Sequence, residues 1–292
     1  MMKKILTITI ALAALLAPSC RKVDDGSDID KSGFTVFRAD TEELEIESGV
    51  KVSDTWADGD MLGVFGSESG VNEAYVLKRS GVGKAEAAFY GPLVKGGKVT
   101  AYFPYADDVA LQDGLVPFWL NPVQTYDAES GAAEFFKRYC NLCVASTADD
   151  ATLHFRYPLG MLEIQIRFDE TVSVSGMSVS SDSGIAGRLL AAGDGSSSES
   201  AISAHTVSLD FGGVPVQSRT ADGFAAFRFV LRPGVYPAKS LVLNITALDE
   251  EITVRLGETV VERVKGNNFN VTTVVVGTSD IPGFNKEDGY LE

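Results

Sequence analysis

The chain has 292 residues, with 40 acidic against 25 basic side chains and a formal net charge of −15 at pH 7. This excess of negative charge repels phosphate backbones and anionic lipids, which argues against nucleic-acid binding and against membrane attachment through a basic patch. The length suffices for one large or two ordinary domains.

The N-terminal residues have the pattern of an export signal. Two lysines precede an apolar run from Ile5 to Leu16, which is too short to span a membrane as a helix. Residues 1–19 are therefore predicted to be a signal peptide. Cys20 follows small residues and resembles the lipobox cysteine of bacterial lipoproteins, whose thiol is acylated. Ordinary cleavage of a plain signal peptide is the alternative.

Residues 20–32 are polar and rich in Asp, so they are predicted to form a flexible tether. Asp24 and Asp25, directly after the cysteine, resemble the surface-export signal of Bacteroidota lipoproteins, although linker charges would look the same. The expected location is the outer membrane or the cell surface, with a lipid-anchored precursor.

From residue 33 onward, short apolar and β-branched runs alternate with Gly, Pro, Asp and Asn. In "MLEIQIRF", Leu162, Ile164, Ile166 and Phe168 fall on one face of a strand, and Glu163 falls on the other. Many short alternating strands separated by turn residues indicate an antiparallel β-sandwich.

A boundary is predicted near Asp169, because the longest alternating strand ends there and a Ser/Gly-rich stretch begins. It would divide the chain into an N-terminal sandwich (33–168) and a C-terminal sandwich (169–277), followed by a tail (278–292). The segment "DAESGAAEFFKRY" is the exception to the strand pattern, and it is expected to form either a short helix or an extended loop.

The stretch "DTWADGDMLGVF" contains an acidic cluster that could bind a metal or form a turn. Asp-Gly pairs supply the positive φ angle and local hydrogen bonds of a tight turn, and the EF-hand spacing of calcium ligands is absent. We therefore predict a turn at Asp58, Gly59 and Asp60, with Trp56 packing across it and the following apolar residues entering the core.

Cys140 and Cys143 form a C-x-x-C without a second cysteine pair or a nearby histidine. They are predicted to be buried thiols or a local disulfide, in preference to metal or redox chemistry. His154 and His205 lie outside any metal-binding motif, and no catalytic constellation is found. The sequence thus predicts no enzyme, no catalytic residue, no metal site and no cofactor.

Several motifs follow one another in an order that resembles the fimbrillin family, the subunits of type V pili in Bacteroidales. They are "TWADGDMLGVF", "KVTAYFPYADDV", "LHFRYPLGMLEIQI", "LRPGVYPAKSLVLNITA" and "KGNNFNVTTVVV". Tyr157 stands where the family usually has His, and Gly160 and Met161 stand where Ala-Lys is usual. The resemblance covers most of the chain after the signal and implies an all-β protein with two transthyretin-like sandwiches in tandem and no enzymatic activity.

The resemblance also implies that an Arg- or Lys-specific protease removes the first strand of the lipidated precursor, after which a donor segment of the next subunit fills the groove. Here the cut would fall between Arg38 and Ala39; alternatively, Arg38 is an outward-facing residue of a strand that stays. The tail (278–292) is the donor candidate, although Pro282 makes it a poor strand.

Two functions follow from these patterns. The first is a pilus subunit or pilus-associated surface lipoprotein that serves adhesion, with other pilus subunits as partners through β-strand addition and the outer membrane as partner through lipid. The second is a monomeric surface lipoprotein that binds glycans or host proteins. Trp119 could stack on a sugar in that case, but we expect it in the core. The sequence leaves open the position in a fibre and the receptor.

Overall fold

The structure is a computed structural model that describes residues 33–42, 44–46, 50–52, 55–94, 97–148, 152–167, 173–217, 225–247, 250–265 and 271–277. The signal peptide, the tether with Cys20, Phe168 and the C-terminal tail lie outside the described residues. The described helix is not long and apolar enough to cross a membrane.

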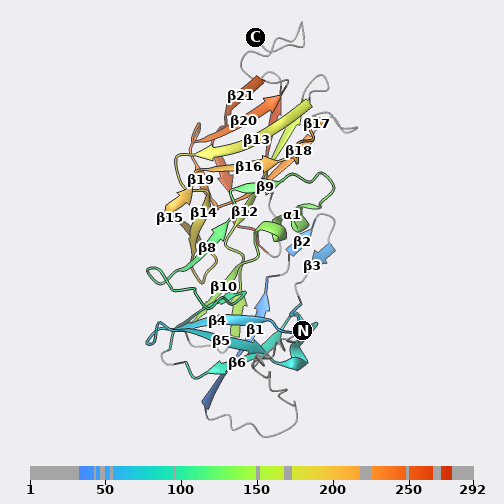
Figure 1. Ribbon diagram of the computed structural model, residues 1–292. Coiled ribbons are helices and arrows are strands. Elements are labelled where there is room, and N and C mark those ends of the chain that lie inside the picture. The colour runs from blue at the N-terminus through green and yellow to red at the C-terminus, as the bar shows by residue number, and fades with distance from the viewer. Residues whose placement is uncertain are drawn as a thin grey trace, which may run out of the picture. The chain divides into compact units, whose positions relative to one another are not determined.

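A seven-stranded sheet with the order β10-β7-β4-β5-β6-β1-β11 contains the N-terminal strand (Figure 1). Its two outer strands meet where Val144 and Arg156 exchange backbone hydrogen bonds of 3.0 and 2.9 Å, so the sheet curls back on itself. The strands are β1 (Phe34–Thr41), β4 (Met61–Gly66), β5 (Asn72–Leu77), β6 (Ala87–Pro92), β7 (Val99–Phe103), β10 (Cys143–Thr147) and β11 (Thr152–Phe155).

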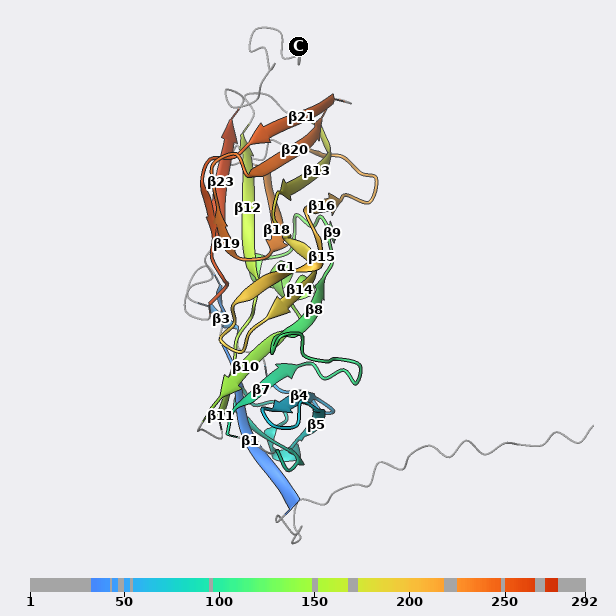
Figure 2. The same cartoon turned by 90° about the vertical axis from the view of Figure 1, so that its left-hand side faces the viewer.

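Three further sheets are built mainly from the second half of the chain (Figure 2). The first contains β18 (Ala225–Leu231), β12 (Gly160–Arg167) and β23 (Val271–Gly277). The second contains β21 (Glu250–Arg255), β20 (Leu241–Ala247), β13 (Ser173–Ser181), β16 (Thr206–Asp210) and β9 (Val123–Thr125), with β17 (Val216–Gln217) paired to β13. The third contains β15 (Ser197–Ala204), β14 (Ala186–Ala191) and β8 (Val116–Leu120).

The remaining elements are short. β2 (Leu44–Ile46) pairs with β3 (Val50–Val52), and β19 (Gly234–Tyr236) pairs with β22 (Thr259–Val261). The 3-10 turn η2 covers Arg79–Gly81, and α1 (Ala132–Tyr139) is the α-helix of the described residues.

The predicted all-β class is confirmed, and the segment left open between helix and loop contains α1. The expected purely antiparallel pairing is wrong in three places, because β1–β11, β12–β23 and β16–β9 are parallel. Parallel strands need a long connection between them, so local alternation does not reveal them. The tandem transthyretin-like arrangement stays a prediction.

Strand pairing crosses the predicted boundary at residue 168. β8 and β9 pair with β14 and β16, and β12 pairs with β18 and β23. Buried residues from both predicted halves belong to one hydrophobic cluster, and Ser32–Glu292 group into one unit. The division into 33–168 and 169–277 stays a prediction.

Strand β12 shows how alternation and burial are related. Leu162, Ile164 and Ile166 are fully buried, as their period predicts. Glu163, on the other face, is also buried, and its carboxylate accepts a 2.8 Å hydrogen bond from Arg228 Nε on β18. Arg228 also donates to the carbonyl of Ser130, just before α1, so a second layer covers this face of β12.

The loop before α1 is closed by a single carboxylate. Asp127 accepts hydrogen bonds from the backbone amides of Glu129 and Ser130, at 3.0 and 3.1 Å, and from the Ser130 hydroxyl at 2.6 Å. Arg138 Nη2, in the last turn of α1, lies 3.0 Å from the same carboxylate. These contacts, led by the Ser130 hydroxyl and then Arg138, hold the pKa of Asp127 well below its usual range.

Candidate assembly site at the N-terminal strand

The two halves of β1 have different neighbours. Residues 34–39 pair antiparallel with β6, whereas residues 38–41 pair parallel with β11. Arg38 therefore lies in both ladders, opposite Ala88 on one side and Thr152 on the other. No strand among the described residues pairs with the other side of residues 34–37. Residues 34–37 are thus held by one strand, and the two ladders overlap at Arg38 and Ala39, the residues on either side of the predicted cut.

A single large side chain anchors the first half of β1 in the core. Phe37 is 5% exposed and its ring centroid lies 5.4 Å from that of Tyr75, whereas Phe34 and Val36 are exposed. The hydroxyl of Thr35 accepts a hydrogen bond from the amide of Val94 at 3.2 Å. Removing this segment would leave an apolar space beside Tyr75 and unpaired backbone groups along β6.

Arg38 presents its side chain to solvent. The side chain is 70% exposed, and its ion pair with Glu86 is long, at 3.6 Å, and solvent-screened. A shallow depression lined by Ser80, Gly81 and Lys84 lies beside it. A trypsin-like protease binds its substrate as an extended strand, so cleavage after Arg38 requires β1 to separate locally from both β6 and β11.

The residue after the predicted cut is held by a tryptophan. Ala39 is fully buried, and its carbonyl accepts a hydrogen bond from Trp56 Nε1 at 3.3 Å; the same N–H group also points to the carbonyl of Ala85 at 3.0 Å. Trp56 packs edge-on against Phe89, Phe103 and Phe155, with ring centroids 4.8, 5.2 and 6.0 Å away. Trp56 therefore fixes the second half of β1 from inside the core.

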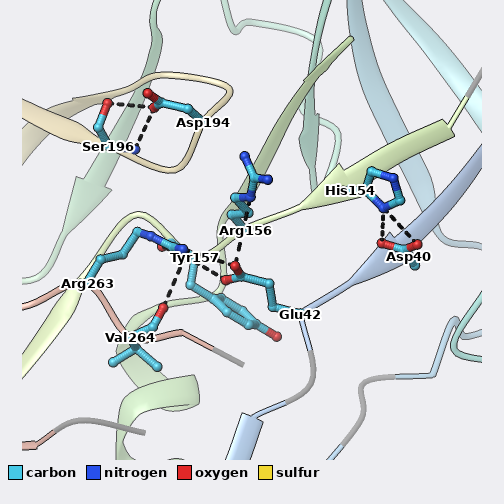
Figure 3. Close-up of polar contacts among 9 residues, drawn as sticks. All are labelled: Asp40, Glu42, His154, Arg156, Tyr157, Asp194, Ser196, Arg263 and Val264. Atoms are coloured by element: carbon cyan, nitrogen blue, oxygen red, sulfur yellow. Dashed lines mark hydrogen bonds and ion pairs between the residues drawn. The ribbon is translucent and has the colours of Figure 1, made fainter. Parts of the chain in front are cut away.

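Two carboxylates tie the end of β1 to other parts of the chain (Figure 3). Asp40 lies 3.0 Å from Nδ1 of His154 on β11. Glu42 forms a bidentate ion pair with Arg263, with N–O distances of 2.6 and 3.0 Å, and it lies 3.9 Å from Nε of Arg156. The amide of Glu42 donates to the carbonyl of Phe155 at 3.0 Å.

Arg263 connects this site to the segment that leads into β12. Its guanidinium also donates to the carbonyls of Tyr157 and Val264, and its backbone bridges to Gly160. Val264 in turn donates its amide to the carbonyl of Leu159 at 2.9 Å. Sequence analysis missed the Glu42–Arg263 pair, because the two residues are 221 positions apart and lie in no common motif.

The acidic cluster forms the predicted turn. Gly59 has a φ of 91°, the amide of Asp60 donates to the carbonyl of Ala57 at 3.1 Å, and the Asp60 carboxylate accepts from the amide of Ala57 at 2.7 Å. The described residues contain no group of three or more His, Cys, Asp or Glu side chains that could hold a metal ion.

Cys140 and Cys143 are present as buried thiols, the first of the two alternatives from the sequence. Cys140 Sγ lies 3.7 Å from the carbonyl oxygen of Leu142. Burial, and to a smaller extent the neighbouring Cys143, raises the pKa of the Cys140 thiol. A thiol with a raised pKa is a poor nucleophile at neutral pH.

Trp119 is not a core residue. Its side chain is 63% exposed on β8, whereas Val116 and Leu120 of the same strand are fully buried. Strand β8 has the sequence VPFWL and contains no polar residue, so alternation could not show which face is inside. The expectation that Trp119 belongs to the core is wrong.

Comparison with known proteins gives a fold but no sequence family. No family model matches the sequence, and no curated protein sequence matches it either. A candidate cell adhesion protein from Bacteroides ovatus has a similar structure: it is 11% identical, the match covers 84% of this chain and 92% of that chain, and the TM-score is 0.52. The chain shares the fold of that protein.

Two fimbrial proteins from Porphyromonas gingivalis are also similar in structure. The tip protein Mfa3 is 10% identical, with 76% of this chain and 81% of that chain covered and a TM-score of 0.38. The anchor protein Mfa2 is 10% identical, with 84% and 90% covered and a TM-score of 0.36. The fold shared with the cell adhesion protein from Bacteroides ovatus agrees with the predicted resemblance to fimbrillins.

Proposed function

We propose that the protein is a fimbrillin-like pilus subunit or pilus-associated surface lipoprotein that assembles by strand exchange and serves adhesion. The observation that carries the proposal is the change of neighbours within β1 at Arg38. The fold shared with a bacterial adhesion protein supports it. In this proposal a precursor reaches the outer membrane through an acylated Cys20, and other pilus subunits are its partners.

Cleavage between Arg38 and Ala39 would divide β1 into a removable and a retained part. The β6 ladder, the Phe37 contact and the Thr35–Val94 hydrogen bond hold residues 34–37, and Arg38 also pairs with Thr152 on β11. Residues 39–42 are held by Trp56, His154 and Arg263. Loss of residues 34–38 would open an acceptor site along the edge of β6. The retained residues 39–42 would form the end of this site, so that an incoming strand stops at the same register each time.

The acceptor site defines what a donor must look like. The donor would pair with the edge of β6 opposite residues 88–92, and it would place one large apolar side chain where Phe37 packs on Tyr75. Burial of that side chain contributes about 2–3 kcal/mol, and each ladder hydrogen bond adds about 1 kcal/mol. The C-terminal tail (278–292) of a neighbouring copy is the donor that we propose, with Phe284 or Tyr290 as the anchor.

The test is cleavage of purified precursor with an arginine-specific protease, followed by N-terminal sequencing and a mildly denaturing gel. The wild-type chain should gain an N-terminus at Ala39 and then form ladders. Arg38→Gln should remain uncut and monomeric. Arg255→Gln, an exposed arginine on β21, is the matched control and should behave as wild type. The proposal is contradicted if the chain is cut before Ala39 and remains monomeric, both alone and when mixed with other pilus subunits.

No enzymatic activity is part of this proposal, and the structural neighbours are adhesion and fimbrial proteins. A monomeric surface lipoprotein that binds glycans or host proteins is the alternative. It is favoured if the cut protein does not polymerise but still binds a receptor. Intact mass of the protein from its native cells would test the acylation of Cys20 separately.

A further inference from the structure

A β-bulge fixes the position of Arg188 on β14. Gly187 lies opposite Ser203 on β15, but Leu189 lies opposite Glu199, so the register shifts around Arg188. The carbonyl of Arg188 accepts hydrogen bonds from the hydroxyls of Ser200 and Ser203, both at 2.7 Å. Bulges of this kind redirect the side chain at their centre and are often found next to functional sites.

The bulge depends on glycine. Gly187 has a φ of 71°, and a Cβ atom there would lie 2.7 Å from the backbone nitrogen of Ala204. Any other residue would therefore have to move the two strands apart. The backbone at Arg188 is thus held by a glycine on one side and by two serine hydroxyls on the other.

On its other edge, β14 pairs with β8 (Figure 1). In this ladder Arg188 lies directly opposite Trp119. Opposite residues of an antiparallel pair share one face, with Cβ atoms about 4.5–5.5 Å apart. Both side chains are exposed, whereas Leu189 and Leu120, on the other face, are fully buried. No hydrogen bond, ion pair or ring contact within the described part of the chain engages the Trp119 indole or the Arg188 guanidinium.

An exposed indole beside an uncompensated guanidinium fits one ligand chemistry in particular. The flat indole packs against the C–H face of a sugar ring, and its N–H group can donate to a ring hydroxyl. The guanidinium binds a carboxylate with two parallel hydrogen bonds. We propose that Trp119 and Arg188 form a binding site for an acidic sugar, a pyranose that carries a carboxylate.

The charge of the chain makes this arrangement selective. With a formal net charge of −15, the surface repels anions in general. A ligand carboxylate is therefore bound favourably only beside an unpaired cation such as the Arg188 guanidinium. A peptide strand that pairs with β8 is the less suitable occupant, because Pro117 lacks the N–H group that a ladder needs. An acidic sugar uses the side-chain face and needs no backbone pairing.

This inference deepens the proposed adhesion function and rests on it for its biological role, yet it can be tested without assembly. Trp56 is 3% exposed, so a ligand-induced change in tryptophan fluorescence of the folded chain reports on Trp119. Uncleaved full-length monomer is titrated with sialyllactose, with lactose and with a hexaglutamate peptide. Sialyllactose should alter the fluorescence and bind about tenfold more tightly than lactose, since only it has a carboxylate.

The variants are measured by calorimetric titration, because Trp119→Ala removes the fluorescent reporter. Trp119→Ala should abolish binding, and Arg188→Gln should reduce the affinity for sialyllactose to that for lactose. The matched controls are Val235→Ala and Arg255→Gln, exposed residues on other sheets, and both should bind as wild type.

Three results would overturn the inference: no binding of sialyllactose at millimolar concentration, binding that survives both variants, or equal affinity for hexaglutamate. The same variants are also cleaved at Arg38 and examined for ladders. Normal polymerisation without sugar binding refutes the sugar site alone, whereas sugar binding without polymerisation refutes strand exchange alone.

Discussion

Glu42 and Arg263, 221 residues apart, face each other with both carboxylate oxygens within 3.0 Å of the guanidinium nitrogens. Their side chains are 21% and 16% exposed, so water screens this pair far less than it screens Arg38 and Glu86. The pair joins the end of the first strand to the segment that leads into the last one.

Replacing one partner should leave the other charge without compensation in a half-buried place. Glu42→Leu and Arg263→Leu should each lower the free energy of unfolding by about 2 kcal/mol. Urea denaturation of both single variants and of the double variant measures this. The double variant should lose clearly less than the sum of the two, and strict additivity would show that the pair contributes no coupling.

Phe37→Ala should weaken the first half of β1 more than any exposed position on that strand. Loss of the ring from beside Tyr75 should lower the free energy of unfolding by about 3 kcal/mol. Cleavage at Arg38 should become faster, because the segment opens more often. The control is Val36→Ala on the exposed face, for which the half-life in an arginine-specific protease should stay near that of wild type.

Trp56→Phe keeps an aromatic ring among Phe89, Phe103 and Phe155 but removes the N–H donor to Ala39 and Ala85. The free energy of unfolding should fall by about 1–3 kcal/mol, because the buried carbonyl of Ala39 and the partly buried carbonyl of Ala85 lose their donor. Hydrogen exchange should accelerate at residues 39–42. Trp119→Phe is the comparison, and unchanged exchange at residues 39–42 in both proteins would argue against Trp56 as the anchor of this segment.

The thiol of Cys140 should resist modification in the folded protein. Burial raises its pKa, so little thiolate is present at pH 8, and the sulfur is covered. Alkylation by iodoacetamide, followed by mass spectrometry, should be at least about 100-fold slower than in guanidinium chloride. Rapid labelling of the native chain, or release of thiols only after a reductant is added, would support the disulfide or redox alternatives.

Asp127 should make the fold sensitive to acid. The Ser130 hydroxyl and Arg138 lower the pKa of this carboxyl in the folded state from its ordinary value of 3.8. The resulting stabilisation is fully present above the unfolded-state pKa and is lost as the pH falls through the folded-state value. Thermal unfolding between pH 7 and pH 3 should therefore show a smaller decrease in Tm below pH 4 for Asp127→Asn. An identical decrease in both proteins would contradict this role.

Local patterns predicted the features that depend on neighbouring residues. The turn at Gly59 follows from residues two or three positions apart, and the inward face of β12 follows from strict alternation of Leu162, Ile164 and Ile166. The helix α1 was left open because eight residues give only two turns of periodicity.

Features that depend on distant residues did not follow from the sequence. Glu163 is buried because Arg228, 65 positions away, neutralises it. The exposed face of Trp119 was misassigned because the strand is short and almost wholly apolar. The proposed sugar site also needs Arg188, which lies on β14, whereas Trp119 lies on β8. The two residues share no sequence motif, so the sequence did not bring them together.

The parallel contact between β12 and β23 sets the order in which the molecule can be completed. Met161 pairs with Val271, so this contact closes a loop of more than a hundred residues. The chain leaves the ribosome with its amino end first, so β12 is made long before β23. The edge of β12 that pairs with β23 therefore stays uncovered until β23 has been made. Until then this edge of β12 presents unpaired backbone groups, so the growing chain is most exposed to pairing with a wrong strand during its own synthesis.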